Sequence, residues 1–128
     1  MTPEEQLRHM ATVYEYEPDT GIFRHRKTGR IRTPYIGKMG PFISNAKHIN
    51  GVRHDCNVTA GRLAWFIVTG RIPGFVRYKN GDNTDHRFSN LKHVTPERAI
   101  ANLKKHDQDV PQWMLDFAKR LKNQDQDR

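Results

Sequence analysis

Cysteine is nearly absent from this chain of 128 residues, in which Cys56 is the single one. One cysteine cannot form an intramolecular disulfide or a cysteine-pair zinc site, and this usage is typical of a reducing compartment. The sequence also lacks any apolar run near the roughly 20 residues that a membrane span needs. Its first five residues have neither the basic nor the apolar region of a signal peptide. We therefore expect a cytoplasmic protein with no membrane partner.

Acidic residues are scarce in the middle of the chain. Residues 22–72 hold ten lysines and arginines against one acidic residue, and residues 73–105 hold seven against three. Both ends are net acidic, and the whole chain has a formal charge of +8. A basic surface of this kind usually faces a polyanion, with a solvated basic face as the alternative. The charge pattern therefore predicts a polyanionic partner.

Hydrophobic periodicity predicts an α+β fold with one domain over residues 1–105. Residues 1–58 are predicted to form a helix to about Val13, then a hairpin with its turn at 18–21, and further strands around the favoured turn Asn50-Gly51. Together these strands make a small N-terminal β-sheet region.

The second part of this domain, residues 59–105, is predicted to begin with a central apolar helix. Thr59 caps this helix and Gly70 ends it. A hairpin around Asn80-Gly81-Asp82 follows, and then a helix that begins at Thr95-Pro96.

Residues 106–128 are predicted to form a C-terminal helix and a polar tail. Trp113, Phe117 and Leu121 recur at helical spacing and form an apolar stripe. Such a stripe is more often packing than a partner surface. A homodimer or a contact with a host protein is the minority alternative.

Several motifs occur in a fixed order along the chain. Residues 16–23 read Tyr-Glu-Pro-Asp-Thr-Gly-Ile-Phe, residues 62–65 read Arg-Leu-Ala-Trp, and Asn80-Gly81-Asp82, Asn90-Leu91 and Thr95-Pro96 follow. Over about residues 14–105 this pattern resembles the HNH endonuclease family, in the branch common among phage and homing-type nucleases. The resemblance implies a ββα-metal unit, in which a two-stranded hairpin and a helix hold a divalent cation beside a histidine base.

The positions that carry catalysis in that family are mostly changed here. Where the family has Asp-His on the hairpin, this chain has Arg77 and Tyr78. Ala99 stands at a ligand position on the helix, Gly61 stands where a histidine often precedes Arg-Leu-Ala-Trp, and Asn90 is retained. A guanidinium repels a divalent cation, and a tyrosine with a reference pKa of about 10 is a poor base at neutral pH. The resemblance therefore implies an emptied active site that has no catalytic residues and needs no cofactor.

Our leading hypothesis is a DNA-binding protein that does not cleave DNA. We expect Arg77 to contact a phosphate directly and Tyr78 to hydrogen-bond or stack beside it, with neutral drift at a dead site as the alternative. Other basic residues of the hairpin, the helix and the upstream strands extend the predicted DNA-binding surface. They are Arg24, Arg26, Lys27, Arg30, Arg32, Lys38, Lys79, Arg87, Lys92, Arg98, Lys104 and Lys105.

Two rival hypotheses remain open. In the first, the protein is an active Mg²⁺- or Mn²⁺-dependent nuclease with substitute residues, for which the candidates are Asp82, Asp85, His86 and His93, and upstream His48, His54 and Asp55. Turn chemistry instead favours bonds from backbone amides to Asp82 and Asp85, and histidines on a basic hairpin are usually surface or phosphate contacts. In the second, the protein inhibits a host factor by binding it with the basic face.

Overall fold

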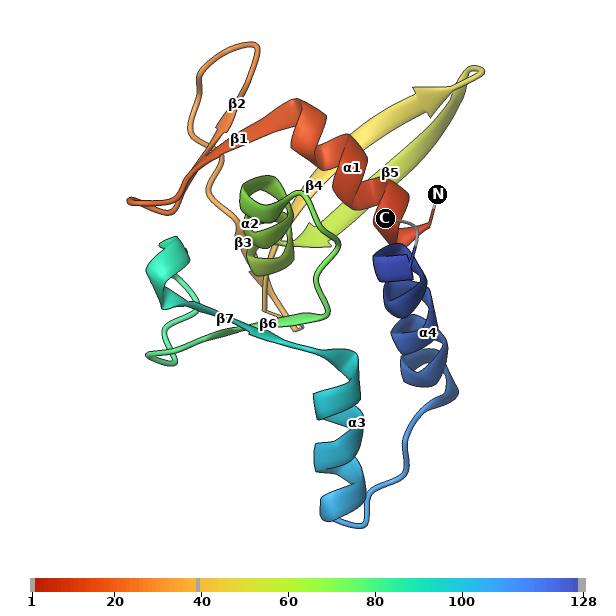
Figure 1. The fold of residues 1–128 in the computed structure, drawn as a ribbon. Helices are drawn as coiled ribbons and strands as arrows, with labels where there is room; N and C mark the ends of the chain where they lie inside the picture. Colours follow the sequence, from red (N-terminus) through yellow and green to blue (C-terminus); the bar gives the residue numbers. More distant parts are fainter. Residues whose placement is uncertain (1, 39, 127–128) are drawn as a thin grey trace.

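The computed structural model of the protein describes residues 2–38 and 40–126, which form four α-helices and three small antiparallel sheets (Figure 1). Two of these sheets have two strands and the third has three. The fold class is therefore α+β, as the sequence predicts. Within the described ranges no helix has the length and apolar character needed to cross a lipid bilayer.

The chain begins with a capped helix that leads directly into a hairpin. Helix α1 (Pro3–Val13) follows Thr2, whose hydroxyl accepts a hydrogen bond from the backbone N–H of Glu5 at 3.1 Å. A proline at the first helical position and acidic residues in the first turn favour this start. Strands β1 (Tyr14–Glu17) and β2 (Ile22–His25) then pair antiparallel. The predicted first helix and hairpin are both present.

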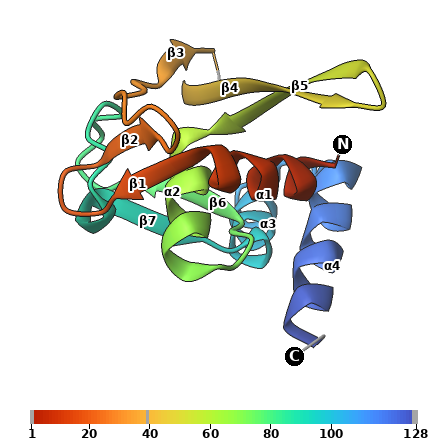
Figure 2. The same cartoon turned by 90° about the horizontal axis from the view of Figure 1, so that it is seen from above.

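A longer hairpin forms the three-stranded sheet. Strand β3 (Tyr35–Gly37) pairs with β4 (Gly40–Ile49), which pairs with β5 (Val52–Thr59). Asn50 and Gly51 join β4 and β5 with φ angles of 51° and 79°, as the mirror-image hairpin turn requires. The tip of this hairpin projects past α1 (Figure 2). The sequence did not predict β3, because three residues are too few to show a period.

Helix α2 (Ala60–Thr69) is the central helix that the apolar run predicts. It follows Thr59 and ends at Gly70, which has a φ of 73°. Residues of α2 contact α1, β1, β4, β5 and the following strand β6 (Phe75–Tyr78). In Figure 1 the helix lies between the β1–β2 pair and β6. The β1–β2 pair and strand β6 therefore pack on different sides of α2.

The hairpin and helix that follow α2 position the candidate site. Strand β6 pairs antiparallel with β7 (Leu91–Val94), which follows the short 3₁₀ turn η1 (Phe88–Asn90). Helix α3 (Pro96–Lys105) starts directly after β7, where Thr95 Oγ1 accepts from the Arg98 N–H at 3.2 Å. The order is thus strand, strand, helix.

Helix α4 (Gln112–Gln126) packs the C-terminal segment onto the same core. Phe117 and Leu121 are buried in one cluster with Leu7 and Met10 of α1. An ion pair of 3.1 Å between Arg120 Nε and Glu4 Oε1 also joins α4 to α1. The apolar stripe is therefore largely packing, as predicted. Trp113 is the exception, because 57% of its surface is exposed.

Candidate nucleic-acid interface

A cleft of about 610 Å³ lies between the β6–β7 pair and helices α3 and α4. Successive residues of a strand point to opposite faces, so Phe75 and Arg77 share the face of β6 that lines this cleft. Their cross-strand partners, Val94 and Lys92, extend the same face on β7. The remaining lining residues come from the helices and are Arg98, Ala99, Ala101, Asn102, Leu103, Lys105 and Met114. We call this space the basic cleft.

Four exposed basic side chains line the basic cleft, and none of its lining residues is acidic. They are Arg77, Lys92, Arg98 and Lys105. Within residues 2–38 and 40–126, none of the four takes part in an ion pair. Arg77 and Lys92 also stand directly opposite each other, where like charges destabilise a sheet. A bound anion would relieve this repulsion, so the arrangement suits an anionic ligand.

Tyr78 lies on the other face of β6 and is not part of this cluster. Its hydroxyl is 3.0 Å from Nδ1 of His86, and burial raises the pKa of Tyr78 to about 12. A Cβ at Gly61 would lie 3.6 Å from this hydroxyl and 3.0 Å from Cγ1 of Val76. The phenol therefore stands beside the bare Gly61 backbone. Adjacent strand residues point apart, so the Tyr78 hydroxyl lies beside His86 and outside the basic cleft, although Tyr78 and Arg77 both line another cavity. That Tyr78 joins Arg77 at one phosphate stays a prediction.

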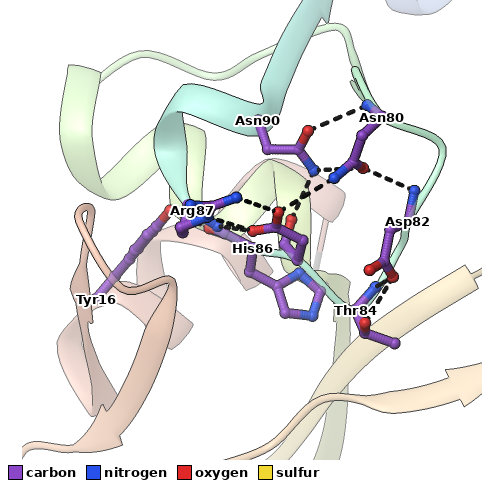
Figure 3. Close-up of polar contacts among 8 residues, drawn as sticks. Tyr16, Asn80, Asp82, Thr84, His86, Arg87 and Asn90 are labelled. Carbon is purple, nitrogen blue, oxygen red and sulfur yellow. Dashed lines mark hydrogen bonds and ion pairs between the residues drawn. The ribbon is translucent and has the colours of Figure 1, made fainter.

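Asn90 holds together the loop that connects β6 to β7 (Figure 3). Its Nδ2 donates to Asn80 Oδ1 and to the carbonyl oxygen of Asp85, both at 3.0 Å, and its Oδ1 accepts from the Asn80 N–H at 3.1 Å. The side chain is buried, with 7% of its surface exposed. Asn90 and Ala99, two positions of the family motif, therefore lie in different surroundings here: Asn90 braces the loop and Ala99 lines the cleft.

The two aspartates of this loop are engaged by neighbouring residues. Asp82 Oδ1 accepts from the backbone N–H and the hydroxyl of Thr84, at 2.9 and 2.6 Å, and these bonds lower its pKa. Asp85 accepts from both Nε and Nη2 of Arg87, at 2.9 and 2.7 Å. The hydrogen bond from Arg87 lowers the pKa of Asp85 to about 2. The predicted hydrogen bonds from backbone amides to Asp82 and Asp85 are present. The guanidinium of Arg87 is paired with Asp85.

His86 is buried rather than exposed, which corrects the expectation of a surface histidine. Only 8% of its surface is exposed, and burial lowers its pKa. The hydroxyl of Tyr16 donates to its backbone carbonyl (Figure 3). Gly21 of the β1–β2 turn approaches the same backbone so closely that a Cβ there would lie 2.4 Å from the carbonyl carbon of His86. The N-terminal hairpin thus covers this histidine.

The other candidate ligands do not converge either. His93 Nε2 accepts from the Gly74 N–H at 2.8 Å, and its ring stacks on Trp65 with centroids 5.3 Å apart. On the β4–β5 hairpin, His48 and His54 point to opposite faces, and Asp55 pairs with Arg53. Across the described ranges, no three His, Cys, Asp or Glu side chains are grouped so that they could hold a metal ion. A divalent cation therefore does not fit the cationic lining of the basic cleft or these engaged residues.

Several upstream basic residues of the predicted surface have intramolecular partners. Arg24 pairs with Glu17 at 3.0 Å, Arg26 donates to the carbonyl of Ala11, and the guanidinium of Arg32 lies 5.0 Å from the ring centroid of Tyr35. The side chains of the others are exposed and have no ion pair in the part of the chain that the structure describes. They are the upstream residues Lys27, Arg30 and Lys38, together with Lys79, which follows β6, and Lys104 of α3.

The apolar floor of the basic cleft was not predicted. Phe75, Val94, Leu103 and Met114 are half-buried and line it. In the sequence they are ordinary packing residues of two strands and two helices. They come to line one cleft only because α4 packs near α3 and β6. No local sequence pattern predicts this packing.

Comparisons with known proteins give little beyond the geometry. No family model matches the sequence, and no curated protein matches it significantly. A solved structure that concerns DNA binding and cleavage by the HNH homing endonuclease I-HmuI is similar, with a TM-score of 0.48 and 21% identity over 83% of this chain. The match covers 60% of that protein, so the chain spans less than two thirds of its length. A similarity of this level carries no functional conclusion for this chain.

Proposed function

We propose that the protein binds DNA through the basic cleft and does not cleave it. The observation that supports this most directly is a cleft whose lining holds no acidic residue and several basic ones, among them Arg77, Lys92 and Arg98. A guanidinium binds phosphate with paired, charge-assisted hydrogen bonds, and such contacts supply most sequence-independent affinity for DNA. No helix of the described chain presents an evident base-reading surface, so phosphate and shape contacts dominate.

The position of Arg77 explains how the cleft could bind a phosphate without a metal ion. The resemblance to HNH nucleases implies that Arg77 and Ala99 correspond to two metal-ligand positions, and both residues line the basic cleft. A metal ion in such a place neutralises a phosphate, and a guanidinium can do the same without an ion. Arg77 therefore takes over the role of the cation in binding, and none of its role in hydrolysis.

The absence of cleavage follows from the groups that face the cleft. General-base catalysis is typically worth ~10²–10⁴ in rate, and the basic cleft offers no base. Tyr78 has a raised pKa and faces away, and His86 is buried. Among the candidate residues of the rival nuclease, Asp82 and Asp85 are held by Thr84 and Arg87.

Binding is expected to resist chelation and to weaken steeply with salt. Four phosphate contacts predict a slope of log K against log salt of roughly −4, or a loss of roughly 10²-fold between 50 and 200 mM salt. Fluorescence anisotropy with a labelled duplex, with and without EDTA, measures both effects. A flat salt dependence, or binding that EDTA abolishes, contradicts the proposal.

Supercoiled plasmid is expected to stay intact with the protein in Mg²⁺ or Mn²⁺. The physical reason is that the described lining of the basic cleft contains no histidine and no carboxylate, the groups that would activate water or bind the metal with a negative charge. Plasmid relaxation on an agarose gel is the measurement, with His86→Ala and His93→Ala variants run beside the parent. Nicking by the parent that either variant loses would support the substitute-residue nuclease instead.

A further inference from the structure

The basic cleft has an apolar floor that phosphate contacts leave unused. Phe75, Val94, Leu103 and Met114 form this floor. The ring of Phe75 is held edge-on by Trp113 and Phe117, at centroid distances of 6.2 and 5.8 Å. We call Arg77, Lys92, Arg98 and Lys105 the cationic rim of the cleft. The sugar-phosphate backbone of a DNA strand bound at this rim is polar throughout. We therefore expect the ligand to have a second, apolar part that packs on this floor.

The size and chemistry of the basic cleft match a nucleotide. A volume of about 610 Å³ lies within the roughly 300–1,000 Å³ of small-ligand sites. A nucleobase has apolar ring faces that pack on aromatic side chains, and in a DNA strand the sugar that carries it is linked to a phosphate on either side. Asn102, whose amide can both donate and accept hydrogen bonds, also lines the cleft and is suited to a base edge.

We propose that the basic cleft accepts one unpaired nucleotide of a DNA strand, with the base on the apolar floor and the flanking phosphates at the cationic rim. This inference rests on the proposed DNA binding and names its preferred substrate: DNA that contains an unpaired nucleotide. A base inside a perfect duplex must first be unstacked and unpaired, which costs free energy that an unpaired base does not.

The spread of the cations favours a strand over a free nucleotide. Arg77 and Lys92 stand on the strand side of the basic cleft, whereas Arg98 and Lys105 stand on α3. Seven residues separate these two along the helix, which corresponds to about 10 Å of axial rise. Basic residues spread over this length of helix and over the facing strands suit the consecutive phosphates of a DNA strand better than a single phosphate group.

The test compares three labelled DNAs with the same base-paired sequence by anisotropy at one salt concentration. They are a perfect duplex, a duplex with one bulged nucleotide, and a duplex whose bulged position is abasic. We expect the bulged duplex to bind about tenfold more tightly than the perfect one, from base stacking on the floor. The abasic bulge should bind like the perfect duplex. Equal binding of the bulged and abasic DNAs would overturn the inference, because flexibility alone would then explain it.

Variants of the cleft test whether the unpaired base binds there. Ala99→Leu fills the cleft and is expected to reduce the tenfold preference to about one, while Gln112→Leu, an exposed position of α4 outside the cleft, keeps it. Ala101→Leu, at an exposed cleft position, serves if Ala99→Leu unfolds. A preference that survives in the folded filled variant places the base elsewhere and overturns the inference.

Further outcomes of these measurements distinguish an error in this inference from an error in the proposed DNA binding. A free deoxynucleoside monophosphate should not compete with the bulged duplex at micromolar concentration, and effective competition would overturn the strand as ligand. Equal affinity for perfect and bulged duplexes would overturn this inference alone and leave DNA binding intact. No binding to any of the three DNAs would overturn the proposed function itself.

Discussion

Replacing Arg77, Lys92 and Arg98 together by alanine is expected to weaken duplex binding about 10³-fold. Each hydrogen bond to a charged group contributes about 1.5–3 kcal/mol, and losses within one cluster are not fully additive. Three such contacts therefore correspond to a change of roughly 4 kcal/mol, or a factor near 10³. Anisotropy at low salt, where the parent binds well, is the measurement.

Thermal stability separates this loss from unfolding. The three side chains are exposed and unpaired within the described residues, and Arg77 stands opposite Lys92. Removing like charges that face each other should leave Tm unchanged or slightly raised. A marked fall in Tm would show that these residues support the fold, and their assignment to a binding surface would then be wrong.

A matched control removes the same charge elsewhere. Arg8, Lys119 and Lys122 are exposed residues of α1 and α4 that do not line the basic cleft. Changing all three to alanine should weaken binding far less, since only long-range attraction is lost. If both triple variants lose affinity equally, binding depends on net charge and the basic cleft is not the interface.

Gly21→Ala is expected to destabilise the protein by about 3 kcal/mol or more, from the left-handed backbone and the overpacking together. Gly21 has a φ of 77°, and a Cβ there would lie 2.4 Å from the carbonyl carbon of His86 and 2.5 Å from the backbone nitrogen of Arg87. Both are backbone atoms, so no flexible side chain can move aside. The turn and the loop would have to separate, which would also strain the hydrogen bond of 2.9 Å from the Phe88 N–H to the Pro18 carbonyl.

Gly29→Ala is the control for the backbone conformation alone. Gly29 has a φ of 71° but no atom within 4 Å of a built Cβ, so its substitution should cost only about 1 kcal/mol. A midpoint shift in thermal unfolding of about 10 °C for Gly21→Ala, against a few degrees for Gly29→Ala, is the expected result. Similar shifts for the two variants would show that the contact between hairpin and loop contributes little.

Local chemistry determined the secondary structure of this chain well. The cap at Thr2-Pro3, the turn at Asn50-Gly51, the stop at Gly70 and the start at Thr95-Pro96 each act within a few residues, and each occurs where it was predicted. The charge excess of the middle of the chain is likewise a property of the sequence. These features need no distant partner, so they can be read along the chain.

Tertiary structure decided which of these residues meet. It placed Arg77 with Ala99 in one cleft, turned Tyr78 toward His86, and buried His86 beneath the turn at Gly21. It also brought α4 against α3 and β6, so that Met114 became part of the floor of the basic cleft. Sequence periodicity identifies which face of each element is apolar. It does not specify which distant face packs against it, because that depends on burying apolar surface across the whole chain.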